Sequence, residues 1–97
     1  MAFENNTSSK LIKMAALLER IDPDTDYGEW IRVLMVIKNE TNGNESGFEL
    51  ADLWSRKGDK YKGENDVRKY WRGLKPNPRK QVGMGSLVRM ANMTTYK

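Results

Sequence analysis

The fold of this chain is decided by residues 47–75, GFELADLWSRKGDKYKGENDVRKYWRGLK. The second half of this stretch places apolar side chains at helical spacings of three and four, at Val67, Tyr70, Trp71 and Leu74. Residues at these spacings share one face of an α-helix, so they predict a helix that starts within residues 63–66 and packs against a core. Pro76 and Pro78 should end this helix, because proline lacks an N–H and restricts the preceding residue.

The first half of the same stretch predicts another helix, which follows a polar turn at residues 41–46. Ser46 and Glu49 have the spacing of a capping box, in which each side chain bonds the backbone N–H of the other residue. The apolar residues that follow continue the helical pattern, and the helix should end near Lys57 and Gly58.

Similar patterns predict three more helices, two before this stretch and one after it. A first amphipathic helix should cover residues 9–20 and be stopped by Pro23. A second helix should start after a cap at Asp26 and continue to Glu40. A short last helix should cover residues 84–93.

These patterns together predict one all-α domain, a small bundle of four to five short helices over residues 9–94. Residues 1–8 are polar, and we expect them to form a disordered tail. The three tryptophans, Trp30, Trp54 and Trp71, lie on the apolar faces of three different helices. We expect all three in a shared core, because aromatic side chains bury large apolar areas.

The composition of the chain excludes most catalytic and metal-binding arrangements. The 97 residues include neither cysteine nor histidine, which removes disulfides, thiolate zinc sites and the commonest general base. The alternating Asp22, Asp24 and Asp26 do not form a calcium loop. Tyr27 and Val33 stand where an EF-hand needs glycine and glutamate. We therefore expect no cofactor, no metal ion and no enzymatic activity of the chain itself.

The sequence also gives no sign of a membrane segment. No stretch approaches the about 20 apolar residues that cross a bilayer. Residues 1–10 lack the basic start and apolar run of a signal peptide. We expect a soluble, cytoplasmic protein without a membrane partner.

Charge is unevenly distributed along the chain. Residues 1–54 contain 5 Lys/Arg and 10 Asp/Glu, a formal charge of −5, whereas residues 55–97 contain 12 and 3, a formal charge of +9. A clustered positive field attracts phosphates, so the basic half favours a polyanionic partner. The alternative is that the two halves neutralise each other in the folded protein.

The candidate contacts to nucleic acid all lie in the basic half. Arg68, Arg72 and Lys75 form a row beside the apolar stripe of the predicted helix, and basic residues precede and follow this row. Tyr61 lies between two lysines and could stack on an unpaired base or fold onto the core. The full set of candidates is Arg56, Lys57, Lys60, Tyr61, Lys62, Arg68, Lys69, Arg72, Lys75, Arg79 and Lys80.

Three blocks of the sequence resemble a known family, the second family of primase C-terminal domains. The central block matches its Gly-Phe-x-Leu, Trp-Ser, Lys-Tyr and Trp-Arg-x-(Phe/Leu)-Lys pattern at Phe48, Leu50, Trp54, Ser55, Lys60, Tyr61, Trp71 and Lys75. An opening block resembles Leu-x-x-Ile-Asp-Pro followed by Asp-Tyr-x-x-Trp-Ile-x-Val, and it includes Leu18, Ile21, Asp22, Pro23, Asp26, Tyr27, Trp30, Ile31 and Val33. The closing block includes Val82, Gly83, Gly85, Ser86, Leu87 and Ala91. The resemblance covers about residues 11–92, and it departs from the pattern at the packing positions Leu34, Ala51 and Met84.

The resemblance implies an all-helical accessory domain of a replication protein from a phage, plasmid or integrated mobile element. Such a domain lies between a primase-polymerase and a superfamily III helicase and carries no active site. It implies that the basic face holds single-stranded or primer-template DNA. The alternative is a docking module that couples the primase-polymerase to the helicase without touching DNA. An unrelated small DNA-binding regulator is disfavoured, because no tight helix-turn-helix precedes the basic helix.

Overall fold

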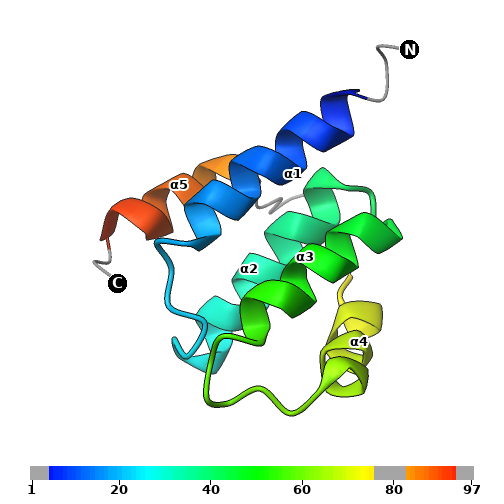
Figure 1. Cartoon of the computed structure of the whole chain (residues 1–97), viewed down its shortest axis with the longest axis vertical. Helices are drawn as coiled ribbons and strands as arrows, with labels where there is room; N and C mark the ends of the chain where they lie inside the picture. The colour runs from blue at the N-terminus through cyan, green and yellow to red at the C-terminus, as the bar shows by residue number, and fades with distance from the viewer. Residues whose placement is uncertain (1–4, 76–82, 94–97) are drawn as a thin grey trace.

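The computed structural model of the chain describes residues 5–75 and 83–93 (Figure 1). Within these residues it contains five helices and no strand, which confirms the prediction of a small all-α bundle. The helices are α1 (Asn5–Leu18), α2 (Tyr27–Glu40), α3 (Glu45–Ser55), α4 (Glu64–Gly73) and α5 (Met84–Met93). None of the described helices is long and apolar enough to cross a membrane.

Helix α2 is the centre of the bundle, because it packs against each of the other four described helices. Figure 1 shows α1 and α5 side by side along one edge, α2 and α3 packed together beneath them, and α4 across the far end. The apolar stripe of α2 is completely buried at Val33, Leu34, Val36 and Ile37. The other buried apolar residues close around it: Met14, Leu18, Ile21, Phe48, Ala51, Trp54, Val67, Trp71, Leu74, Leu87 and Ala91.

The helix starts follow the capping signals in the sequence, with one correction. Asp26 caps α2 as predicted, since its Oδ1 accepts from the backbone N–H of Glu29 at 2.9 Å. Ser46 does not cap α3, and that prediction was wrong. Asn44 occupies the cap with an extended backbone, and its Oδ1 accepts from the N–H of Gly47 at 2.9 Å. Asparagine is as good a cap as serine, so the helix starts two residues earlier and includes Ser46.

Of the two terminal helices, one has the predicted bounds and the other does not. Helix α5 covers residues 84–93 as predicted. Helix α1 begins at Asn5, so residues 5–8 of the predicted tail are helical. Their polar residue types do not stop a helix, because none of them is proline or glycine. At its other end α1 stops at Leu18, where the chain tightens into i to i−3 bonds: the N–H of Arg20 donates to Leu17 O at 3.0 Å.

Two of the three tryptophans lie in the core and the third packs against it, so the prediction of a shared core holds in part. Trp54 and Trp71 are buried, with 2% and 4% of their surface exposed. The indole Nε1 of Trp54 donates to the backbone oxygen of Ile21 at 3.0 Å. Trp30 is only partly buried, because the face of α2 on which it lies extends past the core toward the loop before α4. It therefore belongs to a pocket that is described below.

Two charged side chains at the end of α2 join neighbouring helices. Lys38 Nζ donates to the backbone oxygens of Trp71 and Leu74 at 2.8 and 3.0 Å, where α4 ends and its carbonyl groups lack partners within the helix. Glu40 Oε2 accepts from the N–H of Met84, the first residue of α5, at 3.0 Å. Helix α4 ends at Gly73 with these contacts, whereas Pro76 and Pro78 lie outside the described residues.

Candidate functional site

The loop between α3 and α4 is held in place by one carboxylate from the turn before α2. Asp24 Oδ2 accepts from the N–H of Asp59 at 2.8 Å, and its Oδ1 accepts from the N–H of Lys60 at 3.0 Å. Gly58 permits this approach, because a Cβ at this position would lie 2.6 Å from Asp24 Oδ1. The lysines of the loop therefore start from a fixed backbone.

These bonds make a prediction about the pH dependence of stability. The two N–H donors lower the pKa of Asp24 below its ordinary value of 3.8. The ionised form is favoured in the folded state, so its stabilising contribution is present above pH 3.8 and is lost as the pH falls through the lower folded-state pKa. We expect Asp24→Asn to lower the melting temperature at pH 7 and to lower it less at pH 3. Thermal unfolding between these pH values measures the difference.

The control for this prediction is Glu49→Gln, which removes a carboxylate that is exposed on α3 and has no ion pair within the described residues. It should change the melting temperature at pH 7 only slightly, because an exposed side chain contributes little to stability. A constant difference between wild type and Asp24→Asn across the range would contradict the role assigned to Asp24.

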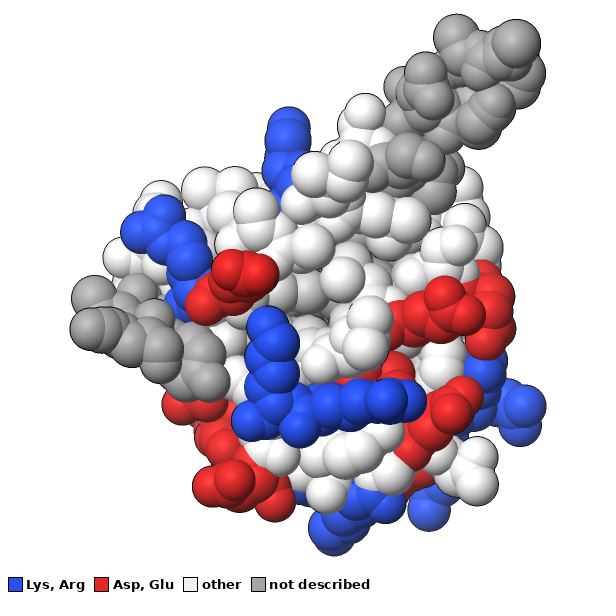
Figure 2. Space-filling model, in the orientation of Figure 1, with Lys and Arg blue, Asp and Glu red and all other residues white. Residues whose placement is uncertain are grey.

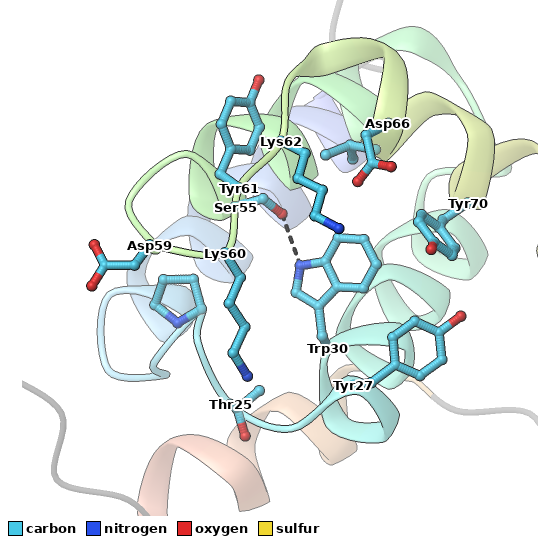
Figure 3. A pocket seen from close by; sticks show the side chains of 12 residues that line it. Thr25, Tyr27, Trp30, Ser55, Asp59, Lys60, Tyr61, Lys62, Asp66 and Tyr70 are labelled. Atoms are coloured by element: carbon cyan, nitrogen blue, oxygen red, sulfur yellow. Dashed lines mark hydrogen bonds between the residues drawn. The ribbon is translucent and has the colours of Figure 1, made fainter.

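A pocket of about 360 Å³ opens beside this loop (Figure 3). Its walls come from the turn before α2, the first turn of α2, the loop and the exposed edge of α4. The lining residues are Pro23, Thr25, Tyr27, Trp30, Ser55, Asp59, Lys60, Tyr61, Lys62, Asp66, Val67 and Tyr70. Four of the twelve are aromatic and two are lysines, so the pocket combines flat apolar surfaces with positive charge.

Three aromatic rings form one side of the pocket. Trp30 and Tyr70 meet edge to face with their ring centroids 5.4 Å apart, and Tyr27 lies 5.8 Å from Tyr70 and 6.3 Å from Trp30. The indole Nε1 of Trp30 donates to the hydroxyl of Ser55 at 3.0 Å, which fixes the orientation of the ring. Tyr27 remains 61% exposed, so this cluster offers a large aromatic surface to solvent.

Lys60 and Lys62 supply the positive charge of the pocket. Figure 3 shows both side chains extending from the loop, with the ammonium of Lys62 beside the indole of Trp30 and that of Lys60 near Thr25. Both lysines are exposed, and neither forms an ion pair in the part of the chain that the structure describes. The pocket also contains two carboxylates, Asp59 and Asp66.

Tyr61 forms part of the pocket wall and does not stand free in solvent. It is partly buried against the core, and its hydroxyl donates to Asp52 Oδ1 at 2.9 Å. Arg56 Nε donates to Oδ2 of the same carboxylate at 2.9 Å. Burial and the neighbouring Asp52 raise the pKa of Tyr61. Of its two predicted roles, Tyr61 is therefore mainly packed on the core, and the carboxylate of Asp52 accepts from both side chains.

Arg68 is committed to contacts within the protein. Its guanidinium donates to both carboxylate oxygens of Glu45, at 2.9 and 2.7 Å, and lies 3.7 Å from Glu64. It also stacks 3.7 Å from the ring centroid of Phe48. The hydrogen bond to Glu45 raises the pKa of Arg68 and lowers that of Glu45. A phosphate would contact Arg68 only by displacing the carboxylate of Glu45.

The remaining candidates divide between two surfaces. Lys57 lies on the loop together with Lys60 and Lys62, whereas Lys69, Arg72 and Lys75 are exposed on and after α4. Arg72 follows Tyr70 by two residues, a rotation of about 200° around the helix. Arg72 therefore faces away from the pocket, whereas Lys69 lies about 100° from Tyr70 around the helix and Lys75 follows the end of α4. Arg79 and Lys80 lie outside the described residues.

The structure brings together aromatic residues that the sequence analysis did not assign to a site. Tyr27, Trp30 and Tyr70 come from two helices that are about 40 residues apart in the sequence, and only the fold places them next to the lysine loop. For Tyr27 and Trp30, the sequence did contain a signal that places the two side chains together. Tyr27 immediately follows the cap Asp26, and Trp30 lies one helical turn later, so both belong to the same face of the first turn.

The uneven charge of the sequence is partly neutralised in the fold. Arg68 and Arg56 of the basic half pair with Glu45 and Asp52 of the acidic half. On the face in Figure 2, basic and acidic side chains are interspersed and form no continuous basic area. Among the described residues there is also no group of three or more acidic side chains that could hold a metal ion. The loop lysines thus stand out by their position at the pocket.

Comparison with known proteins supports the resemblance that the sequence motifs indicated. A search of curated proteins and a search of solved structures each found no match. A family model described as Primase C terminal 2 (PriCT-2) matches residues 14–91. Because this match spans most of the 97 residues, the chain belongs to the Primase C terminal 2 family.

Proposed function

We propose that this domain binds template or primer DNA for the primase with which it is associated, in the replication protein of a phage, plasmid or related mobile element. A Primase C terminal 2 domain is an accessory domain of a primase and not itself a catalytic one. The proposal is supported chiefly by one observation: Lys60 and Lys62 line an aromatic pocket, and neither forms an ion pair within residues 5–75 and 83–93.

Loop lysines suit phosphate contacts for an electrostatic reason. Each Lys or Arg that neutralises a phosphate releases condensed counterions, and this release supplies much of the affinity of proteins for nucleic acid. Lys57, Lys60 and Lys62 lie within six residues of one another on a loop that Asp24 fixes. A phosphate backbone that follows this loop would meet several cations whose backbone positions are already ordered.

The alternative function is docking between the primase-polymerase and helicase without contact to DNA. It is supported by apolar side chains that remain exposed on the edge formed by α1 and α5. Ile12 and Met93 are 71% and 75% exposed. Such residues bury apolar area when a partner protein covers them.

Fluorescence anisotropy with a labelled single-stranded oligonucleotide at several salt concentrations separates the two functions. We compare two variants that each remove three positive charges. The loop variant replaces Lys57, Lys60 and Lys62 with alanine, and the helix variant replaces Lys69, Arg72 and Lys75. If each loop lysine contacts a phosphate, the slope of log affinity against log salt should fall by about 2, at about 0.7 per contact.

The helix variant should keep most of the slope, because its net charge changes equally but none of its three residues lines the pocket. Equal losses in both variants would show a general charge effect and contradict contacts centred on the loop. A wild-type domain that does not bind at low salt would favour docking.

A further inference from the structure

We propose that the pocket holds one unpaired base of the bound strand. In this arrangement the base lies against Tyr27 and Trp30, and Lys60 and Lys62 contact the phosphates beside it. The inference rests on the proposed function, because it names the part of the strand that the domain recognises. It goes further by assigning the contacts to named aromatic side chains.

The size of the pocket suits a small flat group. Its volume of about 360 Å³ lies near the lower end of the range of about 300–1,000 Å³ for ligand sites. A base with its sugar fits such a space, whereas a large cofactor does not. The pocket is also open at the exposed ring of Tyr27, so a strand can pass along its rim.

The aromatic cluster is organised before any ligand arrives. Contacts with Tyr70 and the bond to Ser55 hold the indole of Trp30 in one orientation. Tyr27 is held by the same two neighbouring rings although most of its surface is exposed. An ordered aromatic surface loses little conformational entropy when a base stacks on it. Stacking on such surfaces is available to every base and to any sequence.

The carboxylates of the pocket favour a base over a phosphate inside it. Asp59 and Asp66 line the same space as Lys60 and Lys62, so the formal charges of the lining cancel. A neutral base suits such a lining, and its amino groups can donate to a carboxylate. The lysines carry the positive charge that phosphates need. The arrangement therefore places the base in the pocket and its phosphates at the lysines.

The base must be unpaired because the faces of a paired base are covered by its neighbours in the duplex. A base reaches a concave aromatic pocket only from a single strand or after leaving the stack. We therefore expect this surface to prefer single-stranded DNA. A primer-template junction would also bind, because its template strand supplies unpaired bases.

The test compares Tyr27→Ala and Tyr27→Phe for binding to a single-stranded oligonucleotide. Tyr27 is largely exposed, so both variants should remain folded, which circular dichroism verifies. We expect alanine to weaken binding by about 5- to 150-fold, the range for loss of one stacking contact. Phenylalanine should retain binding because it keeps the ring. The salt slope should not change, because stacking releases no counterions.

The matched control is Ile12→Ala, which removes an equally exposed apolar side chain from α1 and should bind like wild type. Wild-type affinity for Tyr27→Ala, with normal binding of the strand, would overturn the pocket assignment and leave the proposed function intact. Absence of strand binding by the wild type would overturn both. Deoxyadenosine monophosphate should bind far more weakly than the oligonucleotide, and equal affinity would identify a site for free nucleotides instead.

Discussion

Replacing Trp71 with alanine should remove a large part of the domain's free energy of unfolding. Trp71 is 4% exposed, and its ring packs edge to face on Phe48 at a centroid distance of 5.9 Å. The ammonium of Lys38 lies 5.9 Å from the same ring and bonds the Trp71 backbone. Truncation removes the largest apolar contact between α4 and the bundle and leaves a cavity. Such changes cost about 3–5 kcal/mol, out of a total of about 5–15 kcal/mol for a typical domain.

Urea unfolding monitored by circular dichroism measures this loss directly. The matched control is Arg72→Ala, which changes the next residue on the exposed face of α4 and should alter stability by less than about 0.5 kcal/mol. An unfolding midpoint for Trp71→Ala equal to that of Arg72→Ala would contradict the packing described for α4.

The helices could be predicted from the sequence because each combines a 3.6-residue apolar period with a local stop signal. The caps show the limit of this reasoning. Asn44 and Ser46 are both good caps, and the sequence alone does not say which one adopts the extended backbone. Gly47 decides in favour of Asn44, because its N–H donates to the Asn44 side chain while its missing Cβ lets α3 approach Thr41.

Only part of the candidate site could be predicted from the sequence, because some of its residues come together only in the fold. Lys60, Tyr61 and Lys62 are consecutive, so a basic loop with an aromatic residue is visible in the sequence. Trp30 has the helical position of a core residue, and its role changes only because α2 extends beyond the core at this end. Arg68 was expected to be available to phosphates, but its pairing with Glu45 depends on how α3 and α4 pack. Contacts between helices are not encoded in the periodicity of either helix.

Gly47→Val should destabilise the domain by about 3 kcal/mol, the upper end of the range for overpacking a filled core. Gly47 is buried in the first turn of α3, where a Cβ would overlap Thr41 Oγ1 and lie 3.0 and 3.2 Å from Thr41 Cβ and Cγ2. Thr41 has little freedom to withdraw, because it is buried and its hydroxyl donates to Ile37 O at 2.7 Å. The two methyl groups of valine extend the overlap beyond that of alanine, so Gly47→Ala should cost less.

The same substitution at an exposed glycine distinguishes the effect of close packing on stability from the effect of helix propensity. Gly85→Val makes the same change in α5 at an exposed site where a Cβ would meet nothing within 4 Å. Glycine is a poorer helix former than valine, so at this exposed site the free energy of unfolding should stay level or rise by a few tenths of a kcal/mol. Thermal unfolding of both variants gives the comparison. For a domain of this size, about 3 kcal/mol corresponds to a fall of 12–24 °C in melting temperature, at about 4–8 °C per kcal/mol. Equal melting temperatures for the two variants would mean that α3 does not pack on Thr41 as the structure describes.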